Sequence, residues 1–307
     1  MRSLGQSKKI RDNIDGWLFV LPAFLFLFSF MIYPIAHTFL LSFQKFNFVY
    51  DSNPVFIGLS NYVKVLKTPL FITALKNTLR FTLWYIPSVF ILGFMIGYVI
   101  TLPNFVGSRI SKIVLFIPMV IPLSMSAYMF LFMVNPQWGL LNSFLADTLH
   151  MPMLVRDWMN DTRYALKIIL VVTIWQNIGF VALMFMSGIQ GISSSILEAA
   201  TIDGASAYRK MWSVILPNLK ETFQIVGILT IVTSVKLFSQ VVTMTGALGP
   251  NSAGGPANST LTLYVATWKS AFVNYDMGIG SAMGYLMSLI IFLLFGINFF
   301  VTKSERA

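Results

Sequence analysis

The chain has 307 residues, of which 56% are hydrophobic and only 10% charged, and its mean hydropathy is +0.75. This composition excludes an ordinary soluble globular protein and indicates an integral membrane protein. The net charge of +10 comes from basic residues spread over many loops, which favours membrane edges over nucleic-acid binding, and the absence of cysteine excludes disulfides and thiol chemistry.

Six apolar stretches are long enough to cross a bilayer as helices. The first contains no Lys, Arg, Asp or Glu, is longer than a signal-peptide core and is followed by no small-x-small cleavage site, so we expect a retained span. The predicted fold is an all-α polytopic membrane protein with six transmembrane helices, at residues 17–43, 78–101, 113–134, 165–189, 222–245 and 278–301.

Prolines and glycines mark irregular points within these spans. Pro34 predicts a kink in the first span, and Pro118 and Pro122 predict a disrupted first half of the third. Gly93 and Gly97 have the spacing that allows two helices to approach closely. Between the spans we expect an amphipathic surface helix at 59–66, a polar hairpin at 135–163, a Gly/Pro-rich loop at 246–259 and a short surface helix at 261–275.

The distribution of basic residues predicts the orientation of the chain. Six spans place both termini on one side of the membrane, and the segments on that side carry more Lys and Arg than the segments across from them. An excess of basic residues marks the cytoplasmic side. Both termini and the loop between the fourth and fifth spans are therefore predicted to be cytoplasmic.

That loop predicts a helix, a turn and a second helix. Residues 198–200 are good helix formers, and Gly204 can adopt a backbone conformation that turns the chain. The second helix carries apolar residues at helical spacing and then meets a proline. These residues are Tyr208, Trp212, Ile215 and Pro217. A short helix pair between two spans is suited to docking onto a soluble partner.

The same loop resembles the EAA loop of ABC-importer permeases. The family pattern is Glu-Ala-Ala, three residues, Gly, nine residues and Ile-x-Leu-Pro, and this chain departs from it only in having Val214 for the isoleucine. The resemblance implies a type I ABC importer permease fold in which the loop is a coupling helix held in a groove of a cytoplasmic ATPase. The alternative is an ordinary interfacial hairpin. The implied ATPase-coupling residues are Glu198, Ala199, Ala200, Asp203, Gly204, Tyr208, Trp212, Leu216 and Pro217.

Similarity to carbohydrate-uptake permeases of the maltose and glycerol-phosphate type extends over most of the chain. It is carried by Pro22, Tyr33-Pro34, Ser42-Phe43, residues 57–62 and 77–82, Gly254-Gly255-Pro256 and Ser259-Thr260. The resemblance implies three parts. Residues 1–70 hold a cytoplasmic N-terminus, the first span and an external amphipathic segment; residues 71–301 form the core permease domain with the coupling loop at 190–221; residues 302–307 are a cytoplasmic tail.

The resemblance also implies partners and a location. Such permeases lie in the bacterial cell membrane, pair with a second homologous permease and two copies of an ABC ATPase, and receive solute from an external solute-binding protein. ATP and Mg²⁺ are bound by the ATPase, so we expect no cofactor in this chain. The implied function is a permease subunit for a sugar or oligosaccharide, with a polyol, glycerol phosphate or a secondary transporter as alternatives.

The mechanism follows in part from what the sequence lacks. No GxxxxGK[ST] occurs, so we expect the energy for transport to arrive through a contact with a separate ATPase. A rigid helix pair can act as a lever that tilts the attached fourth and fifth spans and alternates access across the membrane. Glu198 is the candidate for a charge-assisted contact with a basic ATPase residue, and a carboxylate stabilised by a helix-end dipole is the alternative.

Polar side chains within the spans are candidates for the substrate path. Thr230 and Ser234 lie four residues apart on one face of the fifth span, but such hydroxyls also bond backbone carbonyls or bridge helices. Lys236 could hold an anionic substrate or extend to the membrane surface. The spans contain no Asp or Glu, which argues against a proton-coupled transporter or an intramembrane enzyme. The remaining candidates cluster in the fourth span as Trp175, Gln176 and Asn177.

Overall fold

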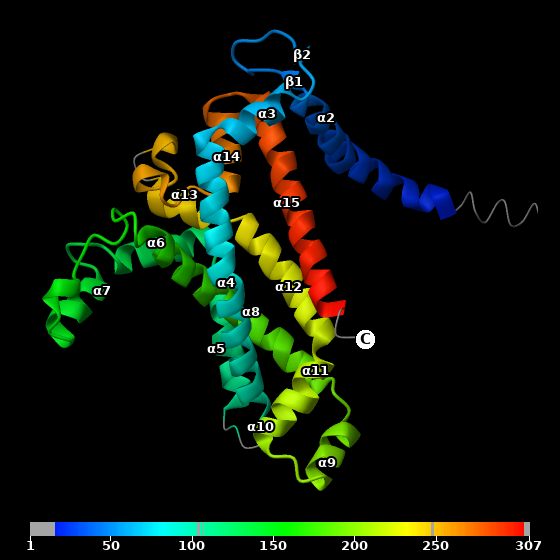
Figure 1. The fold of residues 1–307 in the computed structure, drawn as a ribbon, viewed down its shortest axis with the longest axis vertical. Helices are drawn as coiled ribbons and strands as arrows, with labels where there is room; N and C mark the ends of the chain where they lie inside the picture. The colour runs from blue at the N-terminus through cyan, green and yellow to red at the C-terminus, as the bar shows by residue number, and fades with distance from the viewer. Residues whose placement is uncertain (1–15, 103–104, 106, 247–248, 304–307) are drawn as a thin grey trace, which may run out of the picture.

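A computed structural model of the protein describes residues 16–102, 105, 107–246 and 249–303. Within these residues, five helices are long and apolar enough to cross a membrane, and a sixth candidate is a pair of helices bent at a break. The all-helical prediction is confirmed apart from one short strand pair. The molecule is elongated (Figure 1). Helices α9 (Ser194–Ile202) and α10 (Ala207–Lys210) lie at one end. Strands β1 (Gln44–Lys45) and β2 (Val55–Phe56) and helix α3 (Ser60–Lys67) lie at the other.

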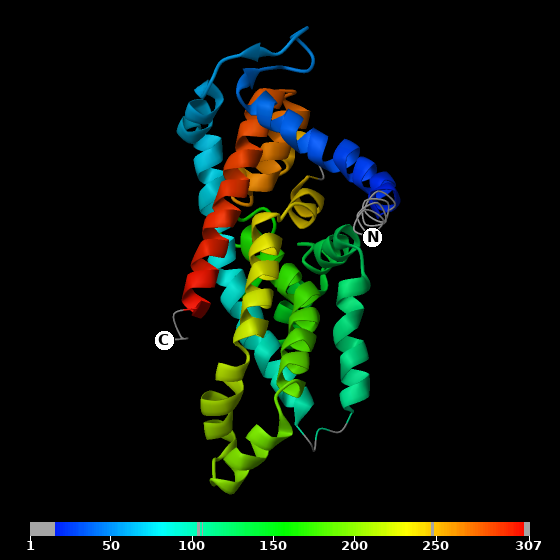
Figure 2. The same cartoon turned by 90° about the vertical axis from the view of Figure 1, so that its right-hand side faces the viewer.

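The first span is a helix from Gly16 to Ser42 that departs from the rest of the molecule (Figures 1 and 2). It contains a π-helical turn, η1 (Phe28–Ile32), followed by α2 (Tyr33–Ser42). Pro34 has no N–H to continue the bonding ladder, and the predicted irregularity lies just before it. None of the apolar window of this helix is buried.

The end of the first span is tied down by side-chain hydrogen bonds. The Ser42 hydroxyl lies 2.7 Å from the Tyr62 hydroxyl, and the Tyr285 hydroxyl donates to the Ile35 carbonyl at 2.6 Å. Strand β1 (Gln44–Lys45) pairs antiparallel with β2 (Val55–Phe56), and the predicted helix at 59–66 is α3 (Ser60–Lys67). These contacts lie at the end of the first span, and the apolar window of the span is not buried by the described residues.

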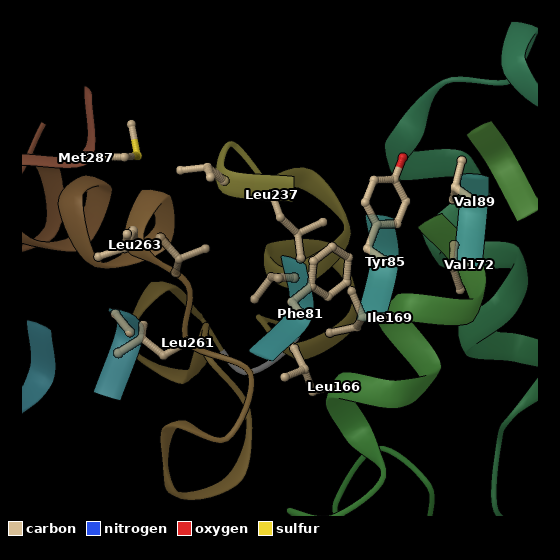
Figure 3. Close-up of a cluster of buried hydrophobic side chains, with 14 of the residues drawn as sticks. Phe81, Tyr85, Val89, Leu166, Ile169, Val172, Leu237, Leu261, Leu263 and Met287 are labelled. Carbon is tan, nitrogen blue, oxygen red and sulfur yellow. The ribbon is translucent and has the colours of Figure 1, made fainter. Parts of the chain in front are cut away.

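The core forms where α4 (Pro69–Thr101) crosses α8 (Ala165–Gln190). A Cβ atom at Gly93 would lie 2.6 Å from Val181, and one at Gly97 would lie 2.6 Å from the Ala182 carbonyl oxygen. The close approach predicted from the glycine spacing is therefore confirmed. Figure 3 shows the side chains that pack at one side of this crossing, with Phe81, Tyr85 and Val89 from α4 and Leu166, Ile169 and Val172 from α8.

The predicted third span is broken into α5 (Ser108–Val120) and α6 (Leu123–Met133), which meet at an angle of 95°. The break falls at Ile121 and Pro122, as the prolines predicted. Helix α5 remains against α8, because Gly179 leaves space for the Leu115 backbone.

The fifth span is also interrupted, although it contains no proline. Helix α12 (Lys220–Val235) is followed by a break at residues 236–238 and then by α13 (Ser239–Thr245). The last span, α15 (Met277–Lys303), packs against α12 and α2.

The prediction of a surface helix at 261–275 is wrong. Helix α14 (Leu263–Trp268) and the π-helical η7 (Lys269–Val273) pack against α15, and Leu261, Leu263 and Val265 are buried (Figure 3). The segment is too short to span a membrane but apolar enough to fill the interior between α4 and α15.

The remaining short elements lie in three connections between the spans. The hairpin at 135–163 contains α7 (Leu140–Ser143), η2 (Phe144–Thr148) and η3 (Pro152–Leu154). The Gly/Pro-rich loop contains two single turns, η5 (Pro250–Ser252) and η6 (Pro256–Asn258). The stretch between the fourth and fifth spans contains α9 (Ser194–Ile202), α10 (Ala207–Lys210), η4 (Met211–Ile215) and α11 (Leu216–Asn218).

Candidate functional site

The loop from α9 to α11 forms a helical hairpin that projects beyond the ends of α4, α5 and α8 (Figures 1 and 2). It follows α8 directly and leads into α12, so it is joined to both spans. We call residues 194–218 the coupling hairpin.

The turn of the coupling hairpin is a glycine-specific helix end. Gly204 has φ of +71°, a region that L-residues with a side chain seldom occupy. Its N–H donates to the Thr201 carbonyl, and the N–H of Ala205 donates to the Ala200 carbonyl, both at 3.0 Å. These two bonds satisfy the last carbonyls of α9 and reverse the chain.

One polar contact caps the start of the second helix, and another joins it to the first. The Ser206 hydroxyl accepts the backbone N–H of Arg209 at 3.3 Å and caps the start of α10. The Lys210 ammonium donates to the Thr201 hydroxyl of α9 at 2.7 Å. The hairpin is thus held together by its own hydrogen bonds.

An apolar surface covers the tip and one side of the hairpin. Tyr208 is 70% exposed and Trp212 is 53% exposed, with ring centroids 6.1 Å apart, whereas Ile215 one turn further is buried. Ile202, which the sequence reading did not single out, is 86% exposed at the end of α9. The sequence signal that could have identified Ile202 is its position two residues before Gly204, beside the expected turn.

Glu198 lies in the middle of α9 and is exposed. Its carboxylate forms no hydrogen bond or ion pair with any described residue. Because the carboxylate is in the middle of a helix, it is not beside the partial charge of a helix end, which argues against stabilisation by the helix dipole. Its neighbours divide between the two faces, since Ala199 is exposed and Ala200 buried. The other expected coupling residues follow, with Asp203 at the exposed C-cap of α9 and Leu216 and Pro217 in α11.

Two of the five candidate substrate-path residues are sealed between helices. The Thr230 hydroxyl donates to the Val226 carbonyl at 2.8 Å, and Ser234 accepts from the Thr82 hydroxyl of α4 at 3.0 Å. Both side chains are buried. Hydroxyls with such contacts satisfy a backbone carbonyl within a helix or join one helix to another.

The other three candidates lie on α8 in different surroundings. Trp175 packs on Phe130 of α6 with ring centroids 5.2 Å apart. Gln176 donates to the Ile121 carbonyl at 2.9 Å, which otherwise loses its partner at the α5–α6 break. Asn177 lines a cavity, and its amide also donates to the Thr173 carbonyl.

That cavity has a volume of about 450 Å³ and lies at the break between α12 and α13. Its polar lining comes mainly from the fifth span, and sequence reasoning noted only Lys236 and Asn177 among these residues. A break without proline gives no sequence signal that would have placed the others together. The polar side chains of the lining are Asn177, Thr233, Lys236, Ser239, Gln240 and Tyr264.

Comparison with known proteins places these features in a family. The chain is 30% identical over 300 residues to the probable ABC transporter permease protein YurN of Bacillus subtilis, covering 96% of this chain and 99% of that protein. It is 29% identical over 276 residues to the sulfoquinovosyl glycerol transport system permease protein SmoG of Agrobacterium fabrum, covering 90% of this chain and 86% of that protein.

The fold is shared with a solved transporter. The structure of a bacterial alginate ABC transporter in complex with an alginate pentasaccharide-bound periplasmic protein matches with a TM-score of 0.79 and 14% identity, covering 95% of this chain and 94% of that chain. Residues 89–306 match the family model of the binding-protein-dependent transport system inner membrane component. The matched region contains the coupling hairpin and the interrupted spans. The chain therefore belongs to the family of inner membrane components of binding-protein-dependent transport systems.

Proposed function

We propose that this chain is the permease subunit of an ATP-driven importer for a sugar or oligosaccharide, and that the coupling hairpin transmits closure of an ATPase to the membrane spans. The observation that carries the proposal is a hydrogen-bonded hairpin, exposed at its apolar tip, that joins α8 directly to α12. Relatives that transport sulfoquinovosyl glycerol and alginate support a carbohydrate substrate.

The hairpin suits a groove on a partner protein. Tyr208 and Trp212 supply apolar area, and Glu198 supplies a carboxylate that no described residue neutralises. A buried, hydrogen-bonded contact to a basic residue would fix the direction of the lever. ATP and Mg²⁺ would be held by the ATPase, and this chain contributes the docking surface and the spans.

Other partners follow from surfaces that this chain leaves uncovered. The first span has none of its apolar window buried, which supports a second permease as the protein that packs against it. The periplasmic protein in the similar alginate complex supports delivery of solute by an external binding protein. The basic bias of the hairpin side supports a bacterial cell membrane location with cytoplasmic termini.

The test is the coupling of transport to ATP hydrolysis. The chain is purified with its partner subunits, and Glu198→Gln and Gly204→Pro are compared with the parent for ATPase co-purification and substrate-stimulated hydrolysis. We expect co-purification and stimulated hydrolysis to fall by about tenfold or more in each variant. In Glu198→Gln a buried charge pair is truncated, which costs roughly 2–5 kcal/mol. In Gly204→Pro the proline ring cannot adopt the positive φ of the turn.

Glu221→Gln is the matched control, because Glu221 is an exposed glutamate in the first turn of α12, outside the coupling hairpin. It should behave like the parent. Normal co-purification and stimulation in both Glu198→Gln and Gly204→Pro would refute the coupling role.

A further inference from the structure

Three cationic side chains converge on the ring of Tyr164. The guanidinium carbon of Arg156 lies 4.9 Å from the ring centroid, that of Arg163 lies 5.6 Å away, and the Lys167 ammonium lies 5.0 Å away. The Trp158 ring packs edge-on against the same tyrosine at 5.5 Å. We call these five residues the Tyr164 cluster.

The cluster lies at a boundary of the membrane. Tyr164 is the residue before α8, and Lys167 is in its first turn, while the coupling hairpin follows the other end of the same span. The cluster therefore lies on the side of the membrane opposite the hairpin. Aromatic rings combined with long cationic side chains are typical of the level of the lipid headgroups.

Exposed apolar residues adjoin the cluster. Met153 is 91% exposed, and Leu154 and Val155 are also exposed directly before Arg156. Apolar side chains beside cations at the end of a span fit a surface that meets lipid: the apolar part faces acyl chains and the charges face headgroups.

The positive charge of the cluster is only partly compensated. Asp161 accepts two hydrogen bonds from the Arg163 guanidinium, at 3.0 and 2.7 Å. This contact, with a smaller contribution from Arg156, lowers the pKa of Asp161 to about 2. Asp157 is bonded to Asn160 instead, and neither Arg156 nor Lys167 forms an ion pair with a described acidic residue.

Like charges gathered on one ring repel one another unless an anion lies among them. The ring attracts each cation through its face but does not neutralise it. A phosphate group can accept hydrogen bonds from guanidinium and ammonium groups at the same time. The single carboxylate of Asp161 does not provide acceptors for all three cations of the cluster.

We propose that the Tyr164 cluster binds the phosphate of an anionic phospholipid headgroup, such as phosphatidylglycerol, on the side of the membrane opposite the coupling hairpin. A lipid is the occupant because the cluster continues from a membrane span into exposed apolar side chains. The site is independent of the proposed transport function and depends only on α8 crossing the membrane.

The test is photolabelling by lipids in a defined bilayer. The chain with its partner subunits is placed in nanodiscs of neutral phosphatidylcholine containing a trace of photoreactive phosphatidylglycerol or photoreactive phosphatidylcholine, and label in residues 151–167 is quantified by mass spectrometry. We expect phosphatidylglycerol to label this segment more, with a loss of about fivefold for each cation removed in Arg156→Gln and Lys167→Gln.

Three further variants serve as controls. Lys76→Gln removes an exposed lysine near the start of α4, which runs toward the hairpin end as α8 does, and should leave the labelling unchanged (Figure 1). Tyr164→Phe keeps the ring and should retain labelling, whereas Tyr164→Leu should lose it.

Equal labelling by the two lipids, or an equal loss in Lys76→Gln, would overturn the proposal. So would a result in which Arg156→Gln with Lys167→Gln leaves lipid labelling intact but weakens binding of the external solute-binding protein in neutral nanodiscs. That result would assign the cluster to a protein partner.

Discussion

At position 204 the coupling hairpin needs a backbone conformation that only glycine adopts at low cost. No other atom lies within 4 Å of where a Cβ would stand, so Gly204→Ala adds no clash and tests the backbone alone. A side chain at positive φ costs roughly 1–2 kcal/mol. We expect ATPase affinity to fall by about 5- to 30-fold, measured by titrating the ATPase onto the reconstituted permease.

Asparagine tolerates the left-handed region better than alanine, so Gly204→Asn should retain more affinity than Gly204→Ala. This order is opposite to helix propensity, where alanine is the better residue. Equal affinities for Ala and Asn would show that the turn conformation does not limit docking.

Individual polar residues show where sequence reasoning reaches its limit. The hydroxyl of Ser234 could be recognised as a polar group on one helix face, but its role depends on Thr82 of a distant helix. Gln176 likewise meets the Ile121 carbonyl, which is freed by a break in another helix. No pattern local to either helix encodes these contacts, whereas the turn at Gly204 is encoded by adjacent residues.

At the scale of helices, the contact of α5 with α8 depends on the absence of a side chain at Gly179. A Cβ at this position would lie 1.7 Å from the Leu115 carbonyl oxygen, far inside contact distance. Gly179→Ala must push the two helices apart, and overpacking of this kind costs about 1–3 kcal/mol. We expect a lower thermal-unfolding midpoint of the purified permease, measured by fluorescence-detected size exclusion.

Gly284→Ala is the matched control in a span, because its Cβ would meet only a methyl group of Thr267 at 3.9 Å. The control should unfold at the parent temperature or slightly above it, since alanine favours helix. A Gly179→Ala protein as stable as the control would show that the α5–α8 contact yields without cost.

Hydropathy located the spans because long apolar helices are required by the bilayer itself. Prolines located the α5–α6 break but not its angle, which is set by how α6 packs on α13 and α8. The break at 236–238 has no proline, and the buried position of α14 depends on space between α4 and α15. The segment at 261–275 is too short for a span, which suggested a surface helix, but tertiary packing buries it.

At the scale of the whole molecule, the first span is the one whose apolar window the described residues leave entirely unburied. Its contacts with the core are concentrated at its end, through Ile35 and Ser42, while the preceding helix extends away (Figure 1). Such a helix contributes little to the stability of the core and leaves its surface for a second permease or for lipid. The two possibilities differ in whether its side-chain pattern matters.

Replacing residues 17–33 by polyleucine of equal length keeps an apolar span and both anchoring contacts. Packing between helices in a membrane depends on side-chain shape rather than hydrophobicity, because lipid is equally apolar. We expect the variant to keep the parent's thermal stability but to co-purify with the second permease about tenfold less, a difference of roughly 1.4 kcal/mol. Full retention of the second permease would mean that lipid, not a partner subunit, covers this helix.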